Sequence, residues 1–184
     1  MIQFNNIRVE YTDSGKGNTI VLLHGYLETK DVWEPLSSEM TGRFRVLSVD
    51  LPGHGGSGIA GETHTMEFLA DAVRHVIATA GASKVLLAGH SLGGYVTLAF
   101  AERYPELLSG YVLFHSHPNA DTPEAIARRK REIAVVRAGK KNIMYPANVS
   151  MMFAGHNLGK MKGALARSKY LASLNPAEGI TALL

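Results

Sequence analysis

A serine between two glycines is the feature that most constrains how this sequence can fold. The pentapeptide at residues 89–93 (GHSLG) follows an apolar run at 85–88 and precedes an apolar stretch at 95–100. A G-x-S-x-G sequence between a strand and a helix is typical of a nucleophile elbow, a turn that strains the serine backbone and exposes its hydroxyl. Glycine is needed at both outer positions because a side chain there would collide with the neighbouring strand or helix. The pattern predicts that Ser91 is a nucleophile.

A second segment predicts where the oxyanion of an acyl-transfer reaction would bind. Residues 19–24 form an apolar run typical of a buried strand, and a glycine turn follows at Gly25 and Tyr26. Acyl transfer develops negative charge on the carbonyl oxygen, which two fixed backbone N–H groups must receive. We expect these donors to be Tyr26 and Leu92, the first residue of the helix after the elbow. We expect His24 to orient the loop through hydrogen bonds rather than to react.

A third segment completes a family resemblance. Residues 50–57 (DLPGHGGS) end a predicted strand at 44–50. Together with HGY at 24–26 and GHSLGG at 89–94, this segment resembles the α/β-hydrolase superfamily, and more narrowly its cytosolic esterase and lipase-like branch. That branch also includes haloperoxidase-like and carbon–carbon bond hydrolases. The resemblance covers most of the chain and implies an α/β fold with a mostly parallel, doubly wound sheet.

The glycine-rich segment also matches a dinucleotide-binding pattern. Residues 53–58 fit G-x-G-x-x-G after a strand, but such a site requires a helix that begins at the glycines. Pro52 precedes these glycines, and the helical pattern begins only near Thr65. We therefore expect no nucleotide site.

Strands and helices alternate along the chain, as in an α/β protein. Strands are predicted at residues 3–5, 7–11, 19–24, 44–50, 84–88 and 108–115, with a turn at 13–18. Helices are predicted at residues 31–40, 66–81 and from the elbow to 104. The first is expected to turn Val32, Trp33 and Leu36 inward, and Thr65 is expected to cap the second.

The pattern changes after the strand that ends near His115. A helix that begins at Thr122-Pro123 continues to Gly139, and further helical segments follow with no convincing strand. The resemblance implies that these helices form a cap over the active site. We therefore expect residues 1–118 to form the hydrolase core and residues 119–184 to form the cap and the start of the following helix.

Several residues are candidates for the wall of the substrate pocket. Flexible apolar side chains in the cap suit a substrate pocket, but they suit the core of the cap equally well. His115 ends the strand beside the elbow strand, where ligands bind in open α/β sheets. The side chain of His90 is expected to point away from Ser91. The candidates are His24, Gly25, His90, His115, Met152 and Phe153.

The last residues predict a helix that begins with Asn175 as its N-cap and Pro176 at its first position. The family pattern implies two further strands, followed by the acid and the histidine of a catalytic triad, and both strands are absent. Serine needs an adjacent base. We therefore expect the triad histidine to lie beyond Leu184 in a longer hydrolase. Strand 108–115 would then be a sheet edge that pairs with another copy or with the C-terminal piece.

Composition limits the remaining possibilities. The chain has no cysteine, no basic leader before an apolar core and no apolar run that could span a membrane. The net charge is +3, and the basic run at 128–131 is expected to be a solvated helix face rather than a nucleic-acid site. We expect a cytoplasmic protein without metal or cofactor, acting on a small ester or acyl substrate. The two candidate functions are a serine hydrolase and a non-catalytic binding module with the same fold.

Overall fold

The central sheet has five strands in the order β3-β5-β4-β6-β7. The computed structural model describes residues 1–184. The strands are β3 (Tyr11–Ser14), β4 (Thr19–Leu23), β5 (Arg45–Val49), β6 (Val85–His90) and β7 (Leu108–Phe114). The sheet is parallel from β5 through β4 and β6 to β7. Only β3 runs antiparallel to its neighbour, which is β5. A separate hairpin joins β1 (Ile2–Phe4) to β2 (Ile7–Val9).

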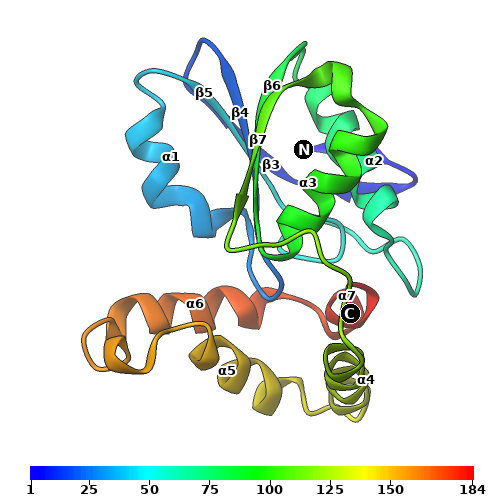
Figure 1. The fold of residues 1–184 in the computed structure, drawn as a ribbon, viewed down its shortest axis with the longest axis vertical. Coiled ribbons are helices and arrows are strands. Elements are labelled where there is room, and N and C mark those ends of the chain that lie inside the picture. The colour runs from blue at the N-terminus through cyan, green and yellow to red at the C-terminus, as the bar shows by residue number, and fades with distance from the viewer.

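Helices cover both faces of the sheet, which confirms the predicted doubly wound architecture (Figure 1). The 3-10 helix η1 (Lys30–Trp33) and α1 (Glu34–Met40) lie on one face, where Trp33 packs against buried side chains of β4 and β5. The other face is covered by α2 (Met66–Thr79) and α3 (Leu92–Arg103). The largest apolar cluster lies on this second face. Since β4 is fully buried, it forms the centre of the structure.

The helix with the strongest sequence pattern forms as predicted. Thr65 caps α2, and its hydroxyl accepts a hydrogen bond from the N–H of Phe68. The side chains at helical spacing, from Leu69 to Ile77, are buried against the sheet. Gly81 follows the end of the helix at a φ of +68°, a left-handed conformation that glycine adopts without strain.

Two predictions near the N-terminus are wrong. The predicted strand 7–11 divides at Glu10, and the predicted turn at 13–18 contains part of β3. The carbonyl of Glu10 accepts from the N–H of Asp50, and its own N–H donates to Ser57, so the chain passes from the hairpin into the sheet here. Asp13 on the edge strand β3 then pairs with Arg45 on the neighbouring strand β5, which explains why such a polar segment forms a strand.

Leu36 corrects the predicted inward face of the first helix. Its side chain is 43% exposed, whereas Trp33 is buried. The element begins as η1 before α1 continues it. A 3-10 helix has 3.0 residues per turn instead of 3.6, so the face expected from a continuous α-helix is displaced.

Four helices follow the sheet: α4 (Pro123–Arg137), α5 (Lys141–Met151), α6 (Lys162–Leu174) and α7 (Ala177–Ala182). They lie together at one end of the sheet, in the lower part of Figure 1. A cluster of buried apolar side chains from these helices encloses Leu27, in the turn after β4. The helices are therefore packed against the carboxyl end of the central strand. None of the helices combines the length and hydropathy needed to cross a lipid bilayer.

Asn175 corrects the predicted start of the last helix. Helix α7 begins at Ala177, and the buried Asn175 side chain makes no cap to it. Instead its Oδ1 accepts from the N–H of Gly55 at 2.8 Å, and its Nδ2 donates to the carbonyl of Glu28 at 3.3 Å. These two contacts replace the local cap. They connect the final helices to the turn after β4 and to the glycine-rich loop after β5.

Candidate active site

The elbow after β6 has the strained geometry that its sequence predicts. Ser91 has φ +48° and ψ −112°, a conformation that costs a residue with a side chain about 1–3 kcal/mol. Its N–H donates to the carbonyl of Phe114 at 3.0 Å, and its carbonyl accepts from the hydroxyl of Ser116 at 2.9 Å. The end of β7 therefore holds the backbone of Ser91 from both sides.

The two glycines of the elbow are required on steric grounds. A Cβ atom on Gly89 would overlap the carbonyl of Gly93, in the first turn of α3. A Cβ atom on Gly93 would lie 2.6 Å from the carbonyl oxygen of Leu23, at the end of β4. Because backbone atoms cause both collisions, no change of rotamer relieves them, and the predicted need for glycine is confirmed.

The two residues predicted to donate to the oxyanion border the same cavity as Ser91. This cavity has a volume of about 270 Å³, and both Tyr26 and Leu92 line it. The N–H of Tyr26, outside any helix or strand, donates no hydrogen bond within the protein. Leu92 is the first residue of α3, a position that has no partner inside the helix. The structure thus brings the predicted nucleophile and both predicted donors to one cavity.

The turn that presents the Tyr26 N–H is fixed from several directions. The N–H of Glu28 donates to the carbonyl of Gly25, and Leu27 has φ +62°, as in the third position of a type II turn. The N–H of Leu27 donates to Nε2 of the buried His54 at 3.2 Å. The Leu27 side chain is enclosed by the helices after the sheet. These contacts hold a leucine in a conformation that normally favours glycine.

His24 and Gly25 lie behind the cavity wall, which corrects their listing among the pocket residues. The His24 ring is fully buried, and neither residue lines the two cavities beside Ser91. Nδ1 of His24 donates to the carbonyl of Gly25 at 2.8 Å, while Nε2 accepts from the N–H of Leu51 at 3.0 Å. Burial lowers the pKa of His24, so the ring is neutral near pH 7. The expected orienting role is confirmed.

The other candidate pocket residues line a second cavity beside Ser91. Its volume is about 360 Å³, and its wall includes His90, His115, Met152 and Phe153. Nδ1 of His90 contacts Oε2 of Glu28 at 2.8 Å, and its ring packs against Trp33 and Phe114. Glu28 was not among the predicted site residues, although an acidic residue three positions after a loop glycine was the available signal.

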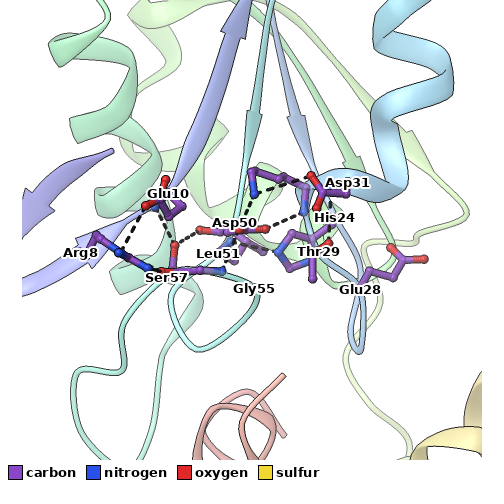
Figure 2. A network of polar contacts seen from close by, with 12 residues as sticks. Arg8, Glu10, His24, Glu28, Thr29, Asp31, Asp50, Leu51, Gly55 and Ser57 are labelled. Carbon is purple, nitrogen blue, oxygen red and sulfur yellow. Dashed lines mark hydrogen bonds and ion pairs between the residues drawn. The ribbon is translucent and has the colours of Figure 1, made fainter. Parts of the chain in front are cut away.

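The glycine-rich loop after β5 encloses a buried carboxylate. Asp50 is 1% exposed and lies at the centre of the contacts in Figure 2, with Ser57 and Glu10 on one side and His24 and Thr29 on the other. Its Oδ1 accepts from the N–H of Lys30 at 2.7 Å; its Oδ2 accepts from Lys30 Nζ at 3.0 Å and from the N–H of Gly56 at 2.9 Å.

The Asp50 carboxylate explains why residue 55 is glycine and why the pKa of Lys30 is raised. A Cβ atom on Gly55 would overlap the Asp50 carboxylate. Burial lowers the pKa of Lys30, but the ion pair with Asp50 outweighs it and raises the pKa above its usual value. The G-x-G-x-x-G match thus reflects a loop folded around an internal anion, and the next helix begins only at Met66.

Charged side chains of α4 border the Ser91 cavity, while the basic run 128–131 is exposed apart from the half-buried Arg129, as expected for a solvated helix face. Arg128, Arg129 and Glu132 all line it. Arg129 forms a two-bond ion pair with Asp121, just before α4, whereas Arg128 has no ion pair. The hydroxyl of Tyr26 is buried there without a partner. Burial raises the pKa of this hydroxyl, and the negative charge of nearby Glu132 raises it further. The sequence could not show that this charged helix faces the elbow.

A larger cavity lies apart from these groups. It has a volume of about 870 Å³ and is bordered by the loop before α2 and by the ends of α4 and α7. None of the residues predicted for the reaction lines it. Size alone therefore does not mark the reactive site in this fold.

Several proteins that this chain resembles in structure or sequence are hydrolases. A thermophilic esterase from Thermogutta terrifontis, solved with malate bound, superposes with a TM-score of 0.91 and 28% identity over 96% of this chain and 65% of that chain. The enol-lactonase from Burkholderia xenovorans LB400 gives a TM-score of 0.89 at 22% identity, over 97% of this chain and 69% of that chain. A pimeloyl-[acyl-carrier protein] methyl ester esterase of Aeromonas hydrophila is 36% identical over 105 residues, 56% of this chain and 40% of that protein.

A family of proteins also matches more than half of this chain. The chain spans less than half the length of the curated relatives it matches, such as a (E)-2-((N-methylformamido)methylene)succinate hydrolase at 40%. The family described as "alpha/beta hydrolase fold" matches residues 18–132, which include the turn after β4, the glycine-rich loop after β5 and the elbow. The chain therefore belongs to the alpha/beta hydrolase fold family.

Proposed function

We propose that the protein is a serine hydrolase that cleaves a carboxylic ester or a related acyl bond through an acyl-enzyme on Ser91. The observation that carries this proposal is that a strained serine shares its cavity with two residues whose backbone N–H groups have no intramolecular partner. That arrangement suits the oxyanion of a tetrahedral intermediate, which needs fixed donors in a site shielded from water. The names of similar proteins, an esterase, a methyl ester esterase and an enol-lactonase, support the same reaction class.

The reaction would proceed in two displacements. Oγ of Ser91 forms a bond to the substrate carbonyl carbon while its proton passes to a base, and the carbonyl oxygen accepts from the N–H groups of Tyr26 and Leu92. Collapse of this intermediate breaks the bond to the leaving alcohol, which takes the proton from the base. Water then attacks the acyl group by the same steps and restores the serine. No metal or cofactor takes part in this scheme.

The base must come from a histidine that can reach Ser91. The His90 ring is bonded to Glu28, and those of His24 and His54 are buried and bonded to backbone groups. We propose that a histidine following Leu184 in the complete protein supplies the base, since about one third of the chain of the solved esterase lies outside the match. His115, which also lines a cavity with Ser91, is the internal alternative.

Labelling with a fluorophosphonate tests this function. In the protein expressed over its whole reading frame, the probe is expected to modify Ser91, and Ser91→Ala is expected to abolish both labelling and turnover of p-nitrophenyl esters. Residues 1–184 alone are expected to react negligibly, because a serine without a base is a poor nucleophile. Mass spectrometry of the labelled peptide identifies the site.

The outcomes distinguish the alternatives. A folded whole protein that is not labelled, or one labelled equally well after Ser91→Ala, would contradict the proposal. Rapid labelling of residues 1–184 would instead show that the base is internal, and His115→Ala would be the first variant to measure.

We also propose that β7 pairs with another strand. It is an edge of the sheet, and Tyr111, Val112 and Phe114 are 50%, 43% and 48% exposed. An apolar edge with free backbone groups favours pairing with a second chain. Purified residues 1–184 are expected to form dimers or larger species in multi-angle light scattering. A stable monomer over a hundredfold range of concentration would count against this proposal.

A further inference from the structure

The Glu28 carboxylate joins the two segments that carry the oxyanion donors. Its Oε2 accepts from the N–H of Gly25 at 2.6 Å and contacts Nδ1 of His90 at 2.8 Å. Because a carboxylate only accepts hydrogen bonds, Nδ1 carries the proton in this pair. Gly25 directly precedes Tyr26, and His90 directly precedes Ser91. One oxygen atom therefore bridges the turn after β4 and the elbow after β6.

The surroundings of this oxygen show that it belongs to a defined site. The side chains of Glu28 and His90 are 14% and 24% exposed. A Cβ atom on Gly25 would lie 2.8 Å from Nδ1 of His90 and 2.9 Å from Oε2 of Glu28, so glycine is needed for the bridge to form. The main-chain carbonyl of Glu28 also accepts from Nδ2 of Asn175.

The turn needs such support because its own backbone is strained. Leu27 is held at φ +62°, and strain of this kind persists only where the surroundings over-determine it. The N–H of Tyr26 itself has no partner, so it does not contribute to fixing its own direction. The direction is set by the neighbouring N–H of Gly25, which is bonded to Glu28, and by that of Leu27, which is bonded to His54.

We propose that Glu28 is a positioning residue of the oxyanion hole, which holds the N–H of Tyr26 at a fixed distance from the N–H of Leu92. The inference rests on the proposed function. Glu28 acts as a hydrogen-bond acceptor and not through its charge, because a negative charge near an oxyanion would oppose the reaction. Misplacement of a reacting or stabilising group by about 1 Å can lower turnover by about a hundredfold.

Two substitutions of Glu28 distinguish its role as a hydrogen-bond acceptor from an effect of its negative charge. In the protein expressed over its whole reading frame, Glu28→Ala is expected to lower kcat by about 10- to 100-fold while KM changes by less than about threefold. Glu28→Gln keeps an oxygen that accepts from both Gly25 and His90, and it is expected to retain kcat within about threefold of the wild type. Asp31→Ala, which removes a nearby carboxylate whose only ion pair is with Lys30 at 3.6 Å, is the control and is expected to leave kcat unchanged.

An amide measurement keeps this inference separate from the proposed function. In 1H–15N spectra the Gly25 amide proton is expected far downfield in the wild type and in Glu28→Gln, and to move upfield in Glu28→Ala. The Tyr26 amide is expected to become more mobile on the nanosecond timescale in Glu28→Ala only. These signals do not depend on catalysis, so an inactive wild-type protein would refute the function without affecting this test.

Two results would overturn the positioning role. The first is a Glu28→Ala protein with wild-type kcat and unchanged amide signals for Gly25 and Tyr26. The second is a Glu28→Gln protein as slow as Glu28→Ala, because the charge and not the acceptor would then be required.

Discussion

Replacement of Asp50 by alanine is expected to lower the free energy of unfolding by about 3–5 kcal/mol, the range found when one partner of a buried ion pair is removed. The Asp50 carboxylate receives the ammonium of Lys30 and the backbone N–H groups of Lys30 and Gly56, and it is almost fully buried. Alanine leaves both backbone N–H groups without their acceptor and leaves the Lys30 ammonium only its longer contact with Asp31, at 3.6 Å. Since burial by itself lowers the pKa of Lys30, that pKa is expected to fall once Asp50 is gone.

Urea unfolding followed by circular dichroism measures the effect. Asp13→Ala is the matched control, because Asp13 also pairs with a basic residue, Arg45, but at a partly exposed edge of the sheet. Such pairs contribute less than about 1 kcal/mol. The double variant Asp50→Ala/Lys30→Met is expected to recover part of the loss, because it removes the unpaired buried charge. An Asp50→Ala protein destabilised no more than Asp13→Ala would show that the network does not hold the loop.

The sequence predicted those parts of the fold that depend on local pattern. The elbow, the buried strand β4 and helix α2 each have a signal within a short window: a glycine spacing, a continuous apolar run, or apolar residues at helical intervals. The steric need for Gly89 and Gly93 follows from the same local turn. These features are decided by neighbours in the chain, so one sequence suffices to find them.

The contacts that complete the site join residues far apart in the chain. Glu28 contacts His90, which lies 62 positions later in the chain, and Asn175 contacts Gly55, which lies 120 positions earlier. No periodicity links such partners, and Asn175 matched the pattern of a local helix cap equally well. The approach of α4 to the elbow could not be predicted for a related reason, because Arg129 pairs with Asp121, which lies eight positions earlier and outside the helix.

The oxyanion donors give the second large expected effect. Tyr26→Pro is expected to lower kcat by about 100- to 1000-fold, the range found when one such donor is lost. The backbone of the turn can accept proline at this position. Tyr26 is the second residue of a turn with the type II pattern, where proline is favoured, and its N–H makes no intramolecular bond that proline would break. Proline also removes the aromatic side chain of Tyr26, which packs against both large apolar clusters, so some loss of stability is expected beside the loss of turnover.

Tyr26→Phe is the matched control for this change. The hydroxyl of Tyr26 is buried without a partner, so its removal is expected to leave both stability and kcat close to the wild type. Both variants would be compared by steady-state hydrolysis of a p-nitrophenyl ester and by urea unfolding, in the protein expressed over its whole reading frame. If Tyr26→Phe were as inactive as Ser91→Ala, the hydroxyl would take part in the chemistry. If Tyr26→Pro folded and kept wild-type kcat, the oxyanion would have to be bound by other donors.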